Sequence, residues 1–145
     1  MKFEDYIAKA VELGQTAIAF TEHGNIYQWV AKKMACDKAG LKYLHGCEVY
    51  LTEKLLLTDP RTGEQNKVRD NYHTILIAKN YAGLQEMNEL ISRSNQGDHF
   101  YYKPRITFDE FLGISSNVIK ISACLASPLN RMSITHPMYE RLLKQ

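Results

Sequence analysis

The sequence predicts an α/β fold in which buried strands alternate with helices. Short, continuous apolar runs such as residues 17–21 are the form expected of strands that are buried on both faces. Between these runs, apolar residues recur three and four positions apart, which is the spacing of an amphipathic helix. Alternation of the two patterns along 145 residues favours parallel β/α units packed as one domain.

Helical spacing predicts helices at 3–13, 27–39, 84–95 and 107–112. Gly14 and Gly40 follow the first two, because glycine tolerates the left-handed backbone that ends many helices. In the last helix, Thr107 and Glu110 form a capping-box pattern, in which each side chain can bond a free backbone N–H of the first turn.

Strands are predicted at 17–21, 43–51, 72–78 and 118–123. The second strand contains Gly46, which indicates a bend or a close approach of neighbouring backbone. Residues 58–71 combine proline, glycine and charges without periodicity, so we expect an exposed loop inserted in the domain. Residues 97–105 are also expected to be loop, while Pro128 and Pro137 can each begin a short helix.

Composition and charge narrow the class of protein. Lysine and arginine outnumber aspartate and glutamate by 18 to 16, and a net charge of +2 is too small to indicate a nucleic-acid partner from electrostatics alone. The sequence has no apolar run of about eighteen residues, and its opening residues lack the apolar core of a secretory signal. We therefore expect a cytoplasmic protein without a membrane span.

The three cysteines are odd in number and widely spaced, so they form neither a disulfide framework nor a C-x-x-C zinc motif. Cys36 falls in a predicted helix and Cys47 in a predicted strand, and both are most simply small buried side chains. Cys124 differs from these two, because it stands directly after the last predicted strand.

Several residues at or near the ends of predicted strands are potential metal ligands: His23, Glu48, His73 and Cys124. In parallel β/α folds, polar side chains at the carboxyl ends of strands face one common site. Imidazole, carboxylate and thiolate together suit zinc, manganese or iron better than calcium. His73 fits this scheme least well, because it lies near the start of its strand. Taken singly, each residue also has an ordinary structural role, and the wide spacing provides no local metal motif.

Five ordered blocks of the sequence carry a family resemblance. They are Thr21-Glu22-His23-Gly24-Asn25, Gly46-Cys47-Glu48-Val49-Tyr50, Tyr72-His73 leading to Ala78-Lys79-Asn80, Phe100-Tyr101-Tyr102-Lys103-Pro104-Arg105-Ile106 and Ile121-Ser122-Ala123-Cys124-Leu125. They resemble the PHP (polymerase and histidinol phosphatase) domain, and more narrowly the form that opens bacterial DNA polymerase III α subunits. The resemblance implies a distorted (β/α)7 TIM-like barrel with divalent metals at its mouth.

The resemblance also implies roles for individual residues. The positions that match metal ligands of the family are His23, Glu48, His73 and Cys124. Glu22 stands where aspartate is commoner in the family, and we expect it to orient a neighbouring ligand. Lys103 and Arg105 are expected to contact substrate phosphates, although exposed lysine and arginine side chains are more often merely solvated.

The resemblance is incomplete at both ends. The family's opening His-x-His strand and its closing Asp-x-His are not found, so we interpret residues 1–145 as a partial PHP domain that lacks the first and last barrel strands. Phosphoesterase chemistry needs the full ligand set. Whether the chain is an enzyme stays open, and we expect the isolated chain to bind divalent metal weakly or not at all and to be inactive.

Three functional hypotheses remain open. The first is part of the PHP domain of a replicative polymerase α subunit, with a proofreading-type phosphoesterase site or its structural remnant, and with DNA and replisome subunits as partners through the parent polymerase. The second is a free-standing metal-dependent phosphatase of the histidinol phosphatase kind, which the block at 100–106 disfavours. The third is a noncatalytic interaction module. A His-x-His just upstream in the gene and a polymerase domain downstream would favour the first.

An incomplete barrel exposes strand edges, whose free N–H and C=O groups can pair with a second copy of the chain. We predict that the isolated chain either self-associates, so that light scattering gives a mass above 16.7 kDa that rises with concentration, or is only marginally stable. A stable monomer at every concentration would contradict this prediction.

Overall fold

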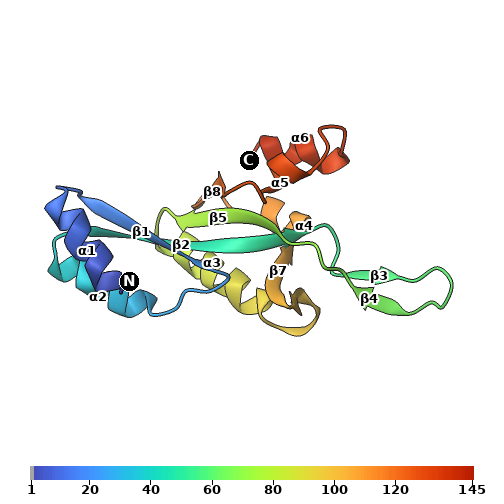
Figure 1. Cartoon of the computed structure of the whole chain (residues 1–145), viewed down its shortest axis with the longest axis horizontal. Coiled ribbons are helices and arrows are strands. Elements are labelled where there is room, and N and C mark those ends of the chain that lie inside the picture. Colours follow the sequence, from blue (N-terminus) through green and yellow to red (C-terminus); the bar gives the residue numbers. More distant parts are fainter. Residues whose placement is uncertain (1) are drawn as a thin grey trace.

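The computed structural model describes residues 2–145 (Figure 1). The helices are α1 (Phe3–Glu12), α2 (Trp29–Lys38), α3 (Tyr81–Ser94), α4 (Phe108–Leu112), α5 (Pro128–Arg131) and α6 (Pro137–Leu143), with a short 3-10 helix, η1 (Gly97–His99). The strands are β1 (Ala17–His23), β2 (Lys42–Thr52), β3 (Leu56–Thr58), β4 (Gln65–Lys67), β5 (Tyr72–Ala78), β6 (Phe100–Tyr101), β7 (Lys103–Thr107) and β8 (Val118–Ser122). Every predicted helix and strand is present, and the boundaries differ from the prediction by at most three residues.

The long strand β2 is the centre of the sheet. β1 lies parallel to residues 42–48 of β2, and β7 lies parallel to residues 50–52. β5 lies antiparallel to residues 46–51. The part of β2 that pairs with β5 overlaps the parts that pair with β1 and with β7. β1 and β7 therefore both lie on the other edge of β2, one after the other. β8 pairs with the far edge of β5, and β6 pairs with β7.

The prediction of parallel β/α units is wrong for β5, which is antiparallel to both of its neighbours. Parallel neighbours need a crossover connection, usually a helix, whereas β2 and β5 are joined by the β3–β4 hairpin. That hairpin returns the chain at the end of the sheet where β2 finishes, so β5 must run in the opposite direction. The predicted α/β class holds, but the sheet is mixed rather than parallel.

The reversed direction of β5 explains how His73, near the start of its strand, can belong with residues near the ends of other strands. The start of β5 lies beside the end of β2, and the end of β8 lies beside the start of β5. β1 ends where His23 stands in register with Glu48 of β2. The predicted ligand positions therefore converge on one region of the sheet.

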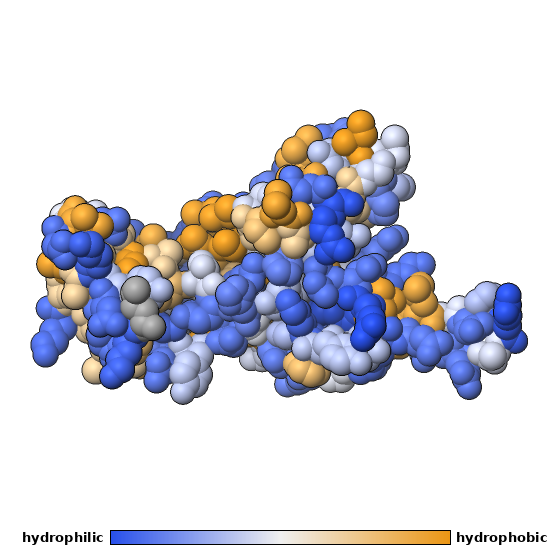
Figure 2. Space-filling model, in the orientation of Figure 1, coloured by the Kyte–Doolittle hydropathy of each residue, from blue (hydrophilic) through white to orange (hydrophobic). Residues whose placement is uncertain are grey.

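Two segments predicted as loop contain short strands. β3 and β4 form an exposed hairpin that projects beyond the main sheet, and its surface is largely hydrophilic (Figures 1 and 2). For residues 97–105 the prediction of loop is wrong, because η1, β6 and most of β7 occupy them. Pro104 cannot donate a backbone hydrogen bond, so strand formation here depends on pairing with β2 and β6 rather than on local sequence.

Two apolar clusters fix the sheet. In the larger, α3 and α4 pack against β2, β5 and β7 around the fully buried Leu51, Leu76 and Ile106. In the smaller, α1 and α2 cover β1 and the start of β2 through Phe20 and Cys36. Burying each large aliphatic or aromatic side chain contributes about 1.5–3 kcal/mol, which holds the strands that carry the candidate ligands.

The predicted helix ends are confirmed. Thr107 Oγ1 accepts a hydrogen bond from the Glu110 N–H at 3.2 Å, and Glu110 Oε2 accepts one from the Thr107 N–H at 2.8 Å. Pro128 and Pro137 are the first residues of α5 and α6. Within residues 2–145, no helix is long and apolar enough to cross a lipid bilayer.

Strand β8 forms one edge of the sheet. Within residues 2–145 it pairs with β5 alone, and two of its apolar side chains, Ile119 and Ile121, are exposed. Figure 2 shows hydrophobic surface in the region where Figure 1 places β5 and β8. An open, apolar edge strand is the feature on which the predicted self-association depends.

The predicted close backbone approach at Gly46 is confirmed. A Cβ atom there would lie 2.9 Å from the carbonyl oxygen of Phe20 on β1 and 3.2 Å from that of Leu76 on β5. Glycine therefore lets β2 lie close to both neighbouring strands at this point, directly before the residues of the candidate site.

Gly83 in α3 gives a test of this packing. A Cβ atom at Gly83 would lie 2.3 Å from the carbonyl oxygen of Asn117, which precedes β8. Glycine to alanine inside a helix normally stabilises by about 0.5–1 kcal/mol, but overpacking costs about 1–3 kcal/mol. We predict that Gly83→Ala lowers the free energy of unfolding by at least about 1 kcal/mol in urea denaturation.

Gly113→Ala is the matched control. Gly113 has a helical φ of −75°, and a Cβ atom there would meet its nearest neighbour at 3.4 Å, an ordinary contact distance. The control should change stability by less than about 0.5 kcal/mol. A Gly83→Ala protein at least as stable as the unsubstituted chain would show that α3 does not pack against Asn117 in this way.

Candidate metal centre

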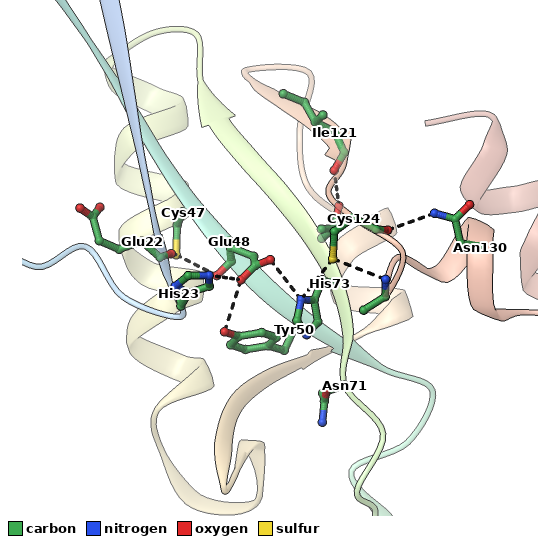
Figure 3. Close-up of polar contacts among 12 residues, drawn as sticks. Glu22, His23, Cys47, Glu48, Tyr50, Asn71, His73, Ile121, Cys124 and Asn130 are labelled. Atoms are coloured by element: carbon green, nitrogen blue, oxygen red, sulfur yellow. Dashed lines mark hydrogen bonds and ion pairs between the residues drawn. The ribbon is translucent and has the colours of Figure 1, made fainter. Parts of the chain in front are cut away.

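Glu48 and His73 face each other on one side of the sheet. Tyr50 of β2 stands directly opposite His73 of β5, and Glu48 lies two residues before Tyr50, so the three side chains share a face. His73 Nδ1 lies 3.1 Å from Glu48 Oε1 (Figure 3). Glu48 is buried and His73 is partly buried, so this pair lies within the fold rather than on its outer surface.

Cys124 completes a group of three possible ligands. Its Sγ lies 3.7 Å from His73 Nδ1, and one ligand atom from each of Glu48, His73 and Cys124 falls within 4.8 Å of the others. The segment after β8 is fixed to β5, because the His73 N–H donates to the Ala126 carbonyl at 2.9 Å. Asn130 Nδ2 also donates to the Cys124 carbonyl at 3.0 Å.

His23 lies at the rim of this group and does not join the convergent three. Its Nε2 is 3.3 Å from Glu48 Oε2, while its side chain is 80% exposed. The turn that follows is tightly packed: Gly24 has a φ of +71°, and a Cβ atom there would lie 2.6 Å from Pro104 Cγ. Three of the four predicted ligands therefore meet, and the fourth contacts them through Glu48.

Tyr50 is a site residue that the sequence prediction missed. Its hydroxyl donates to Glu48 Oε2 at 3.4 Å, and its ring meets the His73 ring edge-on at 4.9 Å between centroids. Burial, followed by the negative charge of Glu48, raises the pKa of Tyr50 to about 12, so the hydroxyl keeps its proton at neutral pH. Strand periodicity places Tyr50 on the same face as Glu48, and that signal could have identified it.

The structure places the Glu22 side chain away from the three convergent ligands, which it was predicted to orient. Successive residues of a strand point to opposite faces, so Glu22 and His23 cannot face the same site. The Glu22 carboxylate instead pairs with the buried ammonium group of Lys32 from α2. Figure 3 shows the Glu22 side chain directed away from Glu48.

The structure places Arg105, predicted to contact substrate phosphate, in the interior of the fold. Arg105 is only 1% exposed, and its guanidinium group donates to the backbone carbonyls of Val68, Asp98 and His99. Burial lowers the pKa of Arg105, but a guanidinium group stays charged at any physiological pH. Arg105 therefore joins η1 to the end of the β3–β4 hairpin and is not available to a substrate.

Lys103 remains a candidate for phosphate contact. Its Nζ lies 4.3 Å from the centroid of the Tyr50 ring, and the hydroxyl of Tyr50 reaches Glu48. A flexible, partly exposed ammonium group at the rim of the site can turn toward an anionic substrate.

The other two cysteines take no part in the site. Cys36 and Cys47 are fully buried, as predicted. Burial raises the pKa of Cys47 to about 12 and also raises the pKa of Cys36, so both stay protonated and unreactive at neutral pH. Cys124 is exposed, which makes it the accessible thiol of the chain.

The donor set fits a divalent transition metal. One imidazole, one carboxylate and one thiol converge, and this mixture of nitrogen, oxygen and sulfur donors suits zinc or iron better than magnesium or calcium. Glu48 also offers its second oxygen to His23 and Tyr50, which fixes the plane of the carboxylate. The arrangement can therefore hold one metal ion with positions left for water or substrate.

Comparison with known proteins identifies the family. The family model of the PHP domain matches residues 1–145, so the chain belongs to the PHP domain family. Its curated relatives include the DNA polymerase III subunit alpha of Borreliella burgdorferi, 34% identical over 93% of this chain and 11% of the relative. The same subunit of Chlamydia pneumoniae is 31% identical over 92% of this chain and 10% of the relative.

The chain spans about a tenth of the length of these curated relatives. A solved structure described as a metal-dependent phosphoesterase, from Bifidobacterium adolescentis, aligns with a TM-score of 0.42 at 15% identity. That alignment covers 65% of this chain and 28% of the other. At this TM-score the likeness adds nothing to the assignment, which rests on the family match.

Substitution at Arg105 tests its structural role. Arg105→Lys keeps the positive charge, but its donors sit on a single nitrogen, whereas the three carbonyls are bonded by three separate nitrogens of Arg105, so we expect buried acceptors to lose their donors. We predict a loss of about 2–4 kcal/mol in the free energy of unfolding, measured in urea. Lys103→Met, two residues away and partly exposed, should change stability by less than about 0.5 kcal/mol. Equal stability of the two variants would contradict this assignment.

Proposed function

We propose that this chain is the PHP domain, or part of it, of a bacterial replicative DNA polymerase α subunit, and that it provides a divalent-metal site for phosphoester chemistry. The convergence of Glu48, His73 and Cys124 is the observation that carries the proposal. The polymerase III α relatives support the parent protein, and DNA and replisome subunits are then its partners in the cytoplasm.

Glu48, His73 and Cys124 would hold the metal ion. When bound, such an ion lowers the pKa of a coordinated water and offsets the negative charge that develops on a phosphoryl group. His23 and Tyr50 hold the second oxygen of Glu48, so the carboxylate keeps one orientation during substrate binding. The Lys103 ammonium group lies over the Tyr50 ring, at the rim of the site. From there its positive charge would meet a substrate phosphate.

The thiol of Cys124 gives the proposed metal its chemical character. Thiolate ligands favour zinc and iron, and among the divalent metals of the first row the affinity for zinc exceeds that for manganese. Magnesium prefers oxygen ligands alone and keeps most of its waters. We therefore expect zinc to bind more tightly than manganese, and magnesium not to bind at this site. Only three donors converge, so we expect binding by the isolated chain to be weak.

Alkylation of Cys124 tests the metal site directly. The thiolate is the reactive form, and Cys124 is the exposed cysteine, so a maleimide pulse followed by mass spectrometry should label it first. We predict that excess zinc slows this labelling at least about tenfold and that the same concentration of magnesium does not. His73→Ala and Glu48→Gln should each remove most of the protection.

His136→Ala is the matched control. His136 caps α6 and pairs with Glu53, away from the three convergent ligands, so zinc protection should persist in this variant. Labelling of Cys124 that zinc does not slow in the unsubstituted chain would contradict the metal site and favour a noncatalytic interaction module. Protection that survives in His73→Ala would mean that the ion binds elsewhere.

A further inference from the structure

We propose that the β6–β7 turn and the segment that enters β5 form a stacking platform for single-stranded DNA, beside the metal centre. The platform is defined by Arg69, Phe100, Tyr101, Tyr102 and Lys103. This inference rests on the proposed function, because it names the substrate class and the path by which a strand would reach the site.

Tyr102 is the centre of the platform. It is 72% exposed, and its backbone has a φ of +59°, in the left-handed region that non-glycine residues rarely adopt. Strained backbone of this kind costs about 1–3 kcal/mol and persists where the surrounding structure holds it. Here it places a large aromatic ring on the surface, 4.6 Å from the ring of Tyr101.

Basic and aromatic side chains surround Tyr102. The guanidinium carbon of Arg69 lies 5.0 Å from the Tyr102 ring centroid, which orients the ring and places a positive charge beside it. Phe100, across the turn, is also exposed. Exposed aromatic rings next to arginine and lysine are the combination on which unpaired bases stack while the cations meet the phosphates.

The platform is joined to the metal centre by the next residue in the chain. Lys103 follows Tyr102 directly, and its Nζ lies over the Tyr50 ring, whose hydroxyl reaches Glu48. Pro104 packs against Gly24, so the turn is also fixed to the loop that follows His23. A strand with a base on Tyr102 would therefore present its adjoining phosphate to Lys103 and the metal ligands.

Local charge indicates that stacking, rather than general attraction to phosphate, would provide most of the affinity. Lys67 lies 3.6 Å from Asp98, so that nearby cation is already paired. The chain as a whole carries a net charge of only +2. A duplex hides its base faces, whereas single strands offer them, so we expect preference for single-stranded over double-stranded DNA.

The test is fluorescence anisotropy of a labelled oligothymidylate of about ten nucleotides with the full chain, in EDTA so that metal binding makes no contribution. We expect Tyr102→Ala to weaken binding about tenfold or more, since one base–aromatic stack is worth about 1–3 kcal/mol. Tyr102→Phe should bind as the unsubstituted chain does. Tyr81→Ala is the matched control, because Tyr81 is 73% exposed at the start of α3 and should not matter.

Arg69→Met and Lys103→Met give independent tests if Tyr102→Ala fails to fold. Each should weaken binding, and Lys103→Met should lower the slope of log affinity against log salt by about 0.7, the value for one phosphate contact with a single strand. Equal affinity of the unsubstituted chain, Tyr102→Ala and Arg69→Met would overturn the platform. So would equal affinity for single-stranded and duplex DNA, or a loss of affinity in Tyr81→Ala as large as in Tyr102→Ala.

Failure of this inference is separable from failure of the proposed function. Zinc protection of Cys124 should be unchanged in Tyr102→Ala, because Tyr102 contacts none of the three convergent ligands. Oligonucleotide binding without zinc protection of Cys124 would contradict the metal site and support the platform. Zinc protection without oligonucleotide binding would do the reverse.

Discussion

The antiparallel pairing of β2 with β5 determines where the candidate ligands lie. It sets Tyr50 opposite His73, and because Glu48 is two residues from Tyr50 it brings the carboxylate within 3.1 Å of the imidazole. It also gives β8 an edge along which the chain runs back to place Cys124 beside His73. A one-residue change in this register would move Glu48 or His73 to the other face of the sheet and abolish the site.

Close packing around β2 protects that register. Gly46 admits the backbones of β1 and β5, and Leu51 and Leu76 are buried from neighbouring strands in the larger apolar cluster. Arg105 fixes η1 and the base of the β3–β4 hairpin through backbone carbonyls. The positive charge at position 105 is thus explained by its structural role, whereas Lys103, two residues earlier, reaches the rim of the site.

The sequence predicted elements better than their directions. Apolar spacing identified the helices and the four main strands, because those signals are local. The direction of β5 depends on the hairpin at 56–67, and β7 depends on pairing with distant residues, so neither has a local signal. Three of the predicted ligands converge, because polar residues near strand ends can face one common site in a mixed sheet as they do in a parallel one. Glu22 lies on the other face from His23, because successive side chains of a strand alternate between the two faces.

The chain belongs to the PHP domain family, and its structure brings three possible metal ligands together in one compact set. The polymerase III α relatives are about ten times longer than this chain. What the chain itself offers is a mixed-donor centre with an accessible thiol, Cys124, and an aromatic, basic surface beside it.

X-ray absorption at the zinc edge, on the full chain loaded with zinc, shows directly whether the Cys124 thiolate is a metal ligand. We predict one sulfur ligand at about 2.3 Å together with nitrogen or oxygen ligands at about 2.0 Å. The sulfur contribution should disappear in Cys124→Ser. A shell of nitrogen and oxygen alone in the unsubstituted chain, or a sulfur ligand that persists in Cys124→Ser, would contradict a metal centre built from Glu48, His73 and Cys124.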